Sequence, residues 1–137
     1  MRVDTQIVDV NNLFPTLAPI ILNGESVLTC LQLIETSEFN GGEEMTSYVS
    51  IVLTQARLIY GYGTLEKGER MANLRDATNI SEISKVKKRY TDKDHIPQLV
   101  INLHNGKEFL RIDFSSEYMM DTFIRALRTL NLVVELT

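Results

Sequence analysis

The clearest pattern in the chain is a regular alternation of apolar and polar residues in two neighbouring runs, 98–104 and 107–115. Every second position in each run is apolar: Leu99, Ile101 and Leu103 in the first, and Leu110, Ile112 and Phe114 in the second. Alternation with a period of two is typical of strands with one buried face. Asn105-Gly106 between the runs is the strongest short-range signal for a two-residue type I′ turn. The pattern therefore predicts a β-hairpin.

Further β-like runs precede this hairpin and are separated by polar or glycine-containing turns. The predicted strands cover residues 26–35, 47–53, 57–65, 71–75 and 80–90. The first of them carries apolar residues on both parities, which predicts that both of its faces are at least partly covered. Gly61 and Gly63 in the third run indicate a bulge or a close backbone approach. Residues 36–46, with Gly41-Gly42 among glutamates, are expected to form an exposed hairpin loop.

Helical signals stand at the two ends of the chain. Residues 13–22 predict a short helical segment that Pro19 breaks or kinks. Ser115 or Ser116 is suited to cap a helix that runs to about residue 130, with one apolar stripe along it. The stripe consists of Met119, Phe123, Leu127 and Leu130. Residues 132–136 are expected either to pack down or to add an edge strand.

The length of 137 residues suits one domain with a single substantial core. We divide it into a helical extension (1–22), a core (23–131) and a tail (132–137). The first ten residues lack the apolar stretch of a secretory signal, so a cytoplasmic location is expected. The lone Cys30 lies in an apolar run and is expected to be a buried, unreactive thiol.

The order of these elements, together with four short motifs, resembles the pleckstrin-homology-like superfold, and most closely its GRAM-like and bacterial pleckstrin-homology types. The motifs are Gly24-Glu25 before the first strand, residues 53–59 (LTQARLI), residues 80–83 (ISEI) and Ser115-Ser116-Glu117 before the last helix. The resemblance implies a mainly β fold: a partly open antiparallel β-barrel of about seven strands, with one end plugged by the C-terminal amphipathic helix. It implies no particular ligand, because the superfold serves lipid, phosphopeptide, polyproline and protein binding.

Charge is distributed unevenly along the chain. No lysine or arginine lies between Arg2 and Arg57, whereas thirteen basic and eleven acidic residues follow from Arg57 onward. Lipid-binding members of the superfold carry basic residues around the first two strands, where several phosphate charges must be neutralised at once. This chain has acidic residues there instead: Glu35, Glu38, Glu43 and Glu44. The usual inositol-phosphate site is therefore not expected.

A different basic cluster is the candidate contact for an anionic ligand or partner. It consists of Lys85, Lys87, Lys88, Arg89 and Lys93. On a strand, Lys85, Lys87 and Arg89 share one face. The alternative interpretation is a solvated strand edge, where lysines discourage unwanted sheet pairing. Nucleic acid is not an expected partner, because the acidic chain lacks a basic face with stacking aromatic residues.

Catalytic and metal-binding patterns are missing from the sequence. Asp92, Asp94 and His95 could be imagined as acid–base groups, but they fall in a polar connection that reads as a solvated turn. The two histidines and the cysteine lie too far apart for a metal-ligand spacing, and no cofactor is expected.

The sequence thus predicts a non-enzymatic interaction module that binds a protein partner or assembles with copies of itself. The expected contact surfaces are the edge around residues 66–75 and the groove between the fifth strand and the C-terminal helix. The alternative is a peripheral membrane-targeting domain that contacts anionic lipid through the basic cluster. An enzyme is less favoured than either.

Overall fold

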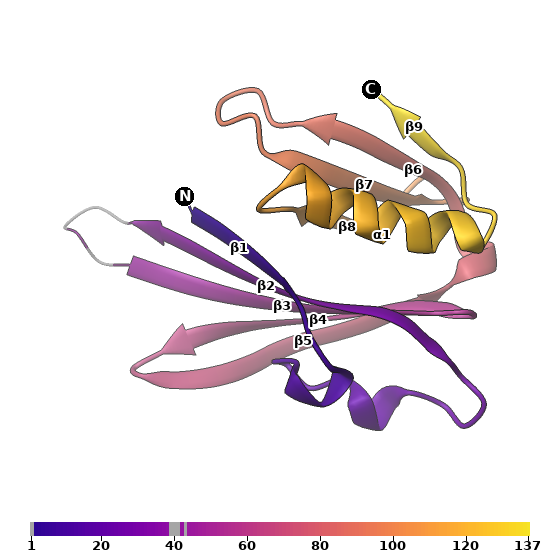
Figure 1. Cartoon of the computed structure of the whole chain (residues 1–137). Helices are drawn as coiled ribbons and strands as arrows, with labels where there is room; N and C mark the ends of the chain where they lie inside the picture. Colours follow the sequence, from indigo (N-terminus) through magenta and orange to yellow (C-terminus); the bar gives the residue numbers. More distant parts are fainter. Residues whose placement is uncertain (1, 39–41, 43) are drawn as a thin grey trace.

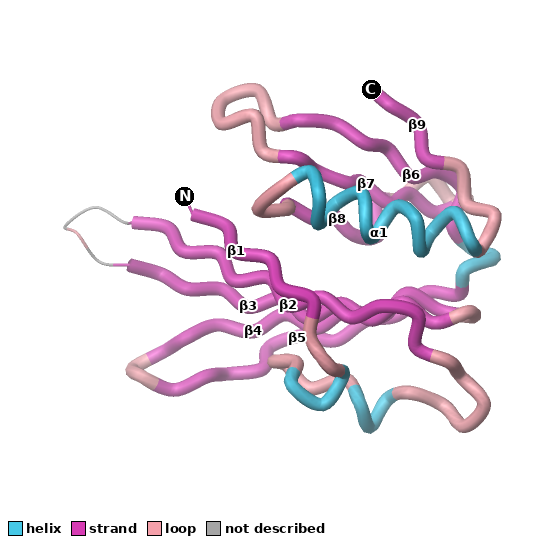
Figure 2. Tube along the Cα trace, in the orientation of Figure 1, coloured by secondary structure: helices cyan, strands magenta, loops and turns pink. Residues whose placement is uncertain are grey.

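The computed structural model of the chain describes residues 2–38, 42 and 44–137, and it contains two β-sheets and one α-helix (Figure 1). The five-stranded sheet is a meander of β1 (Arg2–Ile7), β2 (Val27–Glu38), β3 (Glu44–Thr54), β4 (Arg57–Glu66) and β5 (Glu69–Asn79). The four-stranded sheet has the order β8 (Glu108–Asp113), β7 (Pro97–Leu103), β6 (Ile83–Tyr90) and β9 (Val134–Leu136). The helix α1 (Glu117–Thr129) lies between the two sheets at one side (Figure 2).

The main core lies between the inner faces of the sheets. The larger sheet contributes Leu31, Leu33, Ile51, Leu53 and Leu58, and the smaller sheet contributes Val86, Leu99, Ile101, Leu110 and Ile112. The helix closes one side of this core with Met120, Phe123, Ile124 and Leu127. Each such side chain, when fully buried, stabilises the fold by roughly 1.5–3 kcal/mol. The prediction of a mainly β structure with one C-terminal amphipathic helix is therefore confirmed.

A second apolar layer covers the outer face of the larger sheet. The segment before β2, with the 3₁₀ turns η1 (Val10–Asn12) and η2 (Ala18–Ile20), places Leu13 and Leu17 against Cys30, Val52 and Ile59. Both faces of β2 are covered, as its sequence predicted. The predicted N-terminal helix is replaced by these two short turns, because Pro15 and Pro19 leave no room for a continuous helical hydrogen-bond ladder.

The close backbone approach predicted at the glycines of β4 is confirmed. The ladder between β4 and β5 shifts register between Tyr62 and Gly63. A Cβ atom on Gly63 would lie 2.7 Å from both the carbonyl oxygen of Met71 and the Cε1 atom of Phe14. Only glycine therefore lets the N-terminal segment and β5 reach this point of the sheet together.

The hairpin formed by β7 and β8 is confirmed, but its predicted two-residue type I′ turn is wrong. Gly106 has a φ of 85°, whereas Asn105 is outside the left-handed region that a type I′ turn requires. The Leu103 N–H donates to the Lys107 carbonyl at 2.9 Å, so residues 104–106 form the loop. Two consecutive positive φ values occur instead at Lys67 and Gly68, between β4 and β5.

The structure also has more strands than expected: nine within the described residues rather than about seven. β1 was not predicted, because only Thr5 in its sequence is buried and its apolar alternation is weak. The tail forms the edge strand β9, one of the two alternatives predicted for it. β9 pairs in parallel with β6, so the smaller sheet is not purely antiparallel. β5 is longer than the predicted 71–75, and the loop between β2 and β3 is shorter than 36–46. Positions 39–41 and 43 of that loop lie outside the described residues.

The two sheets remain separate and do not close into a barrel. The described strands form two separate hydrogen-bonded groups, and no strand pairs across them. The predicted cap of the last helix is confirmed, since the Ser116 hydroxyl accepts the Met119 N–H at 3.3 Å. No helix in the described part of the chain is long and apolar enough to cross a membrane.

Candidate functional site

The structure places four of the five basic residues of the predicted cluster on the two faces of β6 and the fifth in the loop that follows. Lys88 lies on the face toward α1, and its Nζ is 3.5 Å from Asp121 Oδ1 on the helix. Lys85, Lys87 and Arg89 lie on the opposite, outer face, as the alternation predicted, with Val86 buried between them. Lys93 is exposed in the loop between β6 and β7. The cluster is therefore split, and only part of it can act together.

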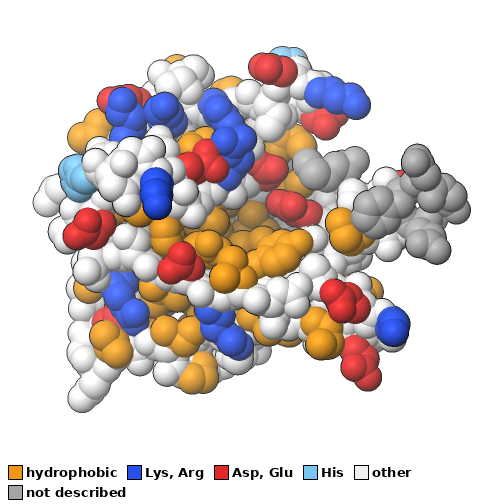
Figure 3. Space-filling model, turned by 180° about the vertical axis from the view of Figure 1, so that it is seen from behind, with side chains coloured by type: hydrophobic (Ala, Val, Ile, Leu, Met, Phe, Trp, Pro, Cys, Tyr) orange, Lys and Arg blue, Asp and Glu red, His pale blue; other side chains and the backbone are white. Residues whose placement is uncertain are grey.

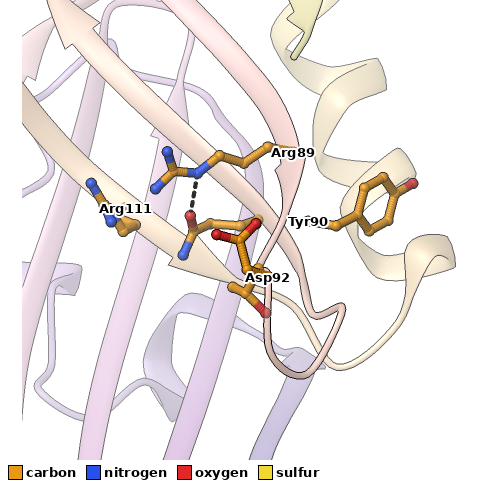
Figure 4. Close-up of a pocket in the computed structure, with 6 residues that line it drawn as sticks. Arg89, Tyr90, Asp92 and Arg111 are labelled. Atoms are coloured by element: carbon orange, nitrogen blue, oxygen red, sulfur yellow. Dashed lines mark hydrogen bonds between the residues drawn. The ribbon is translucent and has the colours of Figure 1, made fainter.

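Arg89 is the member of the cluster that lines a pocket. The pocket has a volume of about 290 Å³ and is formed by Arg89, Tyr90, Thr91, Asp92, Gln98 and Arg111. Arg89 extends from β6 across β7 toward Arg111 of β8 (Figure 4). The Tyr90 ring points away from the arginines toward α1, where its hydroxyl donates to Glu117 Oε1. We call this site the arginine pocket.

A buried glutamine holds Arg89 in place. Gln98 is only 4% exposed, and its Oε1 accepts a hydrogen bond from Arg89 Nε at 2.6 Å. Its Nε2 donates to Asp113 Oδ1 on β8 at 2.5 Å, so both ends of the amide are engaged. The two terminal nitrogens of Arg89 form no hydrogen bond to any described residue. They are thus available to a ligand while the rest of the side chain is already ordered.

The second guanidinium of the pocket is only weakly neutralised. Arg111 Nη2 donates to Glu108 Oε1 at 2.6 Å, which raises the pKa of the Arg111 guanidinium, but about half of each side chain is exposed. Exposed pairs of this kind contribute roughly 0–1 kcal/mol and exchange readily with other partners. Arg89 forms no ion pair with a described residue. Two guanidinium groups on one face suit a carboxylate or a phosphate, which arginine binds with paired N–H donors.

Sequence reasoning missed Arg111 as a partner of Arg89. The signal was present in the strand register: Val100 of β7 pairs with Lys87 on one side and Arg111 on the other. Residues that are directly opposite in an antiparallel ladder share a face, so Arg111 belongs to the face of Lys87 and Arg89. The prediction would have needed the order and register of three strands, which the alternation alone does not provide.

Other predicted candidates do not assemble into a site. Burial raises the pKa of the Cys30 thiol to about 11, with a smaller contribution from the charge of Asp9, so the thiol stays protonated. Asp92, Asp94 and His95 lie in the loop between β6 and β7, and of these only Asp92 lines the arginine pocket. The residues that the structure describes contain no group of three histidine, cysteine or acidic side chains arranged to hold a metal ion.

The end of the β2–β3 hairpin, where the sequence did not predict an inositol-phosphate site, carries mainly acidic side chains in the structure as well. A pocket of about 330 Å³ there is lined by Arg2, Thr36, Ser37, Glu38 and Glu44. This lining contains the carboxylates of Glu38 and Glu44 and the one guanidinium group of Arg2. Glu43 falls outside the described residues.

Comparison of the chain with protein-family models, with curated proteins and with solved structures gave no match.

Proposed function

We propose that the protein is a non-enzymatic interaction module of pleckstrin-homology-like architecture that binds an anionic group of a partner protein in the arginine pocket. The order of elements supports the architecture: a meander β2–β5, a second meander β6–β8 and a closing helix. β1 and β9 are additions to that plan at the two edges. The chemistry of the ligand follows from the pocket.

The observation that carries the proposal is the relationship of Arg89 to Arg111. Both arginines line the pocket on the outer face, Arg89 extends over β7 toward the strand that carries Arg111, and Asp92 is the one carboxylate of the pocket lining (Figure 4). An anion bound in this pocket is attracted by both guanidinium groups, and this attraction favours its binding. Gln98 already restricts Arg89, so little side-chain entropy is lost on binding.

A partner protein fits these observations better than a lipid surface. Membrane attachment through electrostatics requires several cations that reach the surface together. Here Lys88 pairs with Asp121 on the other face, and Lys85 Nζ lies 3.6 Å from Glu135 Oε2 of β9. A compact pocket for one anionic group remains, which suits a phosphorylated or acidic side chain.

A heterologous partner is also favoured over a second copy docked at the 66–75 edge. β5 is the exposed edge strand of the larger sheet, but Asn73 has no residue opposite it in the β4 ladder. Because of this bulge, the side chains of β5 exchange faces of the sheet at this point. Arg70 lies over the rings of Phe14 and Tyr48. Bulges and charges of this kind protect an edge against pairing with another sheet.

The test is a binding titration of the full chain with a short phosphoserine peptide, followed by NMR of backbone amides. We expect the largest shifts at Arg89, Gln98 and Arg111. Arg89→Gln and Arg111→Gln should each weaken binding about tenfold, equivalent to about 1.4 kcal/mol. Arg128→Gln on the exposed face of α1 is the matched control and should change nothing. Vesicles with and without phosphatidylserine form the second arm. Binding that survives Arg89→Gln contradicts the proposal, and binding to the anionic vesicles alone supports the membrane alternative.

A further inference from the structure

The edge strand β8 crosses the inner face of the larger sheet from one side to the other. At one end, the Ser115 N–H just after β8 donates to Thr5 Oγ1 of β1 at 2.9 Å. At the other end, the Phe109 ring meets the Tyr60 ring of β4 edge-on, with 5.3 Å between the ring centroids. Beyond β8 the inner face of the larger sheet continues without a strand of the smaller sheet above it, because β8 is the last strand in that sheet.

This uncovered region carries apolar side chains that are only partly buried. Strand register places Val49 opposite Tyr62 and Tyr62 opposite Leu74, all on the inner face next to Tyr60. Leu74 is 51% exposed, whereas Leu53 and Leu58 farther along the same face are fully buried. Figure 3 shows hydrophobic side chains gathered in a hollow between the two sheets on this side of the molecule. We call the hollow the mouth and define it by Val49, Tyr60, Tyr62, Leu74 and Phe109.

The rim of the mouth is acidic. Glu35 of β2 follows Leu31 and Leu33 in the alternation of the inner face, and burial, with a smaller contribution from the charge of Asp113, raises the pKa of its carboxyl. Asp76 of β5 lies opposite Tyr60 on the inner face. Glu108 and Asp113 of β8 are instead engaged on the outer face, where they accept hydrogen bonds from Arg111 and Gln98. Carboxylates at the border of an apolar surface favour a cationic ligand with apolar groups beside its charge.

The exposed edge of β8 adds backbone hydrogen-bonding groups to this surface. The Phe114 N–H donates to the Pro97 carbonyl of β7 at 2.8 Å. Residues of an antiparallel strand turn alternately toward and away from the neighbouring strand, so Arg111 and Asp113 direct their N–H and C=O groups toward the open edge. Within the described residues no strand pairs with this edge. An extended peptide chain is the ligand that can form hydrogen bonds with such a row of backbone N–H and C=O groups.

We infer that the mouth binds an extended peptide of a partner protein, which pairs with the free edge of β8 as an added strand. One lysine or arginine of that peptide lies beside Glu35, and its apolar neighbours contact Tyr60, Tyr62 and Leu74. This site goes beyond the arginine pocket. It uses the opposite charge, and the free edge of β8 rather than its outer face, so the two sites can fail independently.

The experiment uses the full chain and a fluorescent capped peptide, STVKVTS, with STVEVTS as its charge-reversed partner. We expect STVKVTS to bind at least tenfold more tightly than STVEVTS, and to shift the backbone amides of Arg111 and Asp113 in NMR spectra. Two singly N-methylated forms of STVKVTS test strand pairing. Methylation at a residue that faces β8 should abolish binding, whereas methylation at the next residue should leave binding within twofold of the parent peptide.

Three substitutions separate this inference from the arginine pocket. Glu35→Gln and Leu74→Ser should each weaken STVKVTS about tenfold, and both variants should fold, since Leu74 is exposed and glutamine matches glutamate in shape. Arg89→Gln should leave STVKVTS binding unchanged, and Glu35→Gln should leave phosphoserine-peptide binding unchanged. Equal binding of STVKVTS and STVEVTS, or binding that survives Glu35→Gln, would overturn the inference. Amide shifts confined to β5 or β9 would overturn it as well.

Discussion

Arg57 and Glu25 form a forked ion pair that joins the start of β4 to the segment before β2. Arg57 Nε donates to Glu25 Oε2 at 3.0 Å, and Arg57 Nη2 donates to Glu25 Oε1. The same carboxylate accepts the Leu22 N–H at 2.8 Å and the Thr54 hydroxyl at 2.8 Å. Arg57 Nη2 also donates to the Ile20 carbonyl at 2.9 Å, which ties the N-terminal segment to the larger sheet.

This ion pair makes folding stability dependent on pH below neutrality. The Arg57 hydrogen bond is the main reason that the pKa of Glu25 falls from 4.5 to about 2. A carboxyl with a depressed pKa stabilises the fold above its unfolded-state pKa, and this stability is lost as the pH falls from about 4.5 toward 2. After allowance for solvent screening we expect a contribution of about 1–2 kcal/mol at pH 7.

Urea unfolding at pH 7 and at pH 3 measures this contribution. Glu25→Gln should lower the free energy of unfolding at pH 7 and should reduce the difference between the two pH values. Glu82→Gln, a change on an exposed carboxylate, is the control and should behave as the original protein does. An unchanged pH dependence in Glu25→Gln would show that the pair contributes nothing to stability.

Glu35 should have the opposite effect on stability. Burial and the nearby charge of Asp113 raise its pKa, so the ionised form is disfavoured in the folded state. A carboxyl with a raised pKa binds its proton more tightly in the folded protein, and stability falls as the pH rises through its titration range. Glu35→Gln removes this cost and should raise the urea midpoint at pH 7, with a smaller gain below pH 4. A lowered urea midpoint at pH 7 would contradict the conclusion that the ionised Glu35 carboxylate destabilises the folded protein.

The N-terminal segment should contribute to stability through Leu17. This side chain has 0% exposure and packs on the outer face of the larger sheet against Cys30, Val52 and Ile59. Leu17→Ala should lower the free energy of unfolding by about 2–5 kcal/mol, the usual cost of such a cavity. Leu22→Ala, at a position that is 60% exposed, should cost less than about 0.5 kcal/mol. Equal effects of the two substitutions would mean that the segment does not hold this position.

Gly63 should tolerate no side chain. A Cβ atom there would lie 2.7 Å from the Met71 carbonyl oxygen, which is backbone and has little freedom to move. We expect Gly63→Ala to cost about 1–3 kcal/mol, as overpacking does elsewhere. Ala72→Gly on the neighbouring exposed strand is a control for a small backbone change, with an expected cost within about 1 kcal/mol. Thermal unfolding monitored by circular dichroism distinguishes these outcomes.

Several features of the fold followed directly from local sequence. The alternation in residues 98–115 predicted the β7–β8 hairpin, and Ser116 with the apolar stripe behind it predicted α1. The type of each turn could not be predicted as well. Asn105-Gly106 predicted a two-residue turn but lies in a longer loop, whereas Lys67-Gly68 has the two consecutive positive φ values. β1 escaped prediction because its partner strand and the Ser115 contacts, rather than an apolar pattern, hold it in place.

The candidate sites show the same division between local and long-range information. Arg89 was identified from the basic run in which it lies, and its outward direction followed from strand alternation. That it lines one pocket with Arg111 and donates a hydrogen bond to Gln98 depends on the register of β6, β7 and β8 together. The mouth depends on where β8 crosses the larger sheet, so neither the position of Glu35 at its border nor the exposure of Leu74 could be derived from neighbouring residues.

By itself, the sequence determined which segments become strands or helix and which of their faces are buried. The burial free energy of each side chain and the period of each element are local properties, readable from a few adjacent residues. Only the tertiary structure decided that two arginines line one pocket on the outer face and that the edge of β8 remains unpaired beside a partly exposed apolar surface. These arrangements arise from strand order, register and the crossing of two sheets, which are set by packing between residues far apart in the chain.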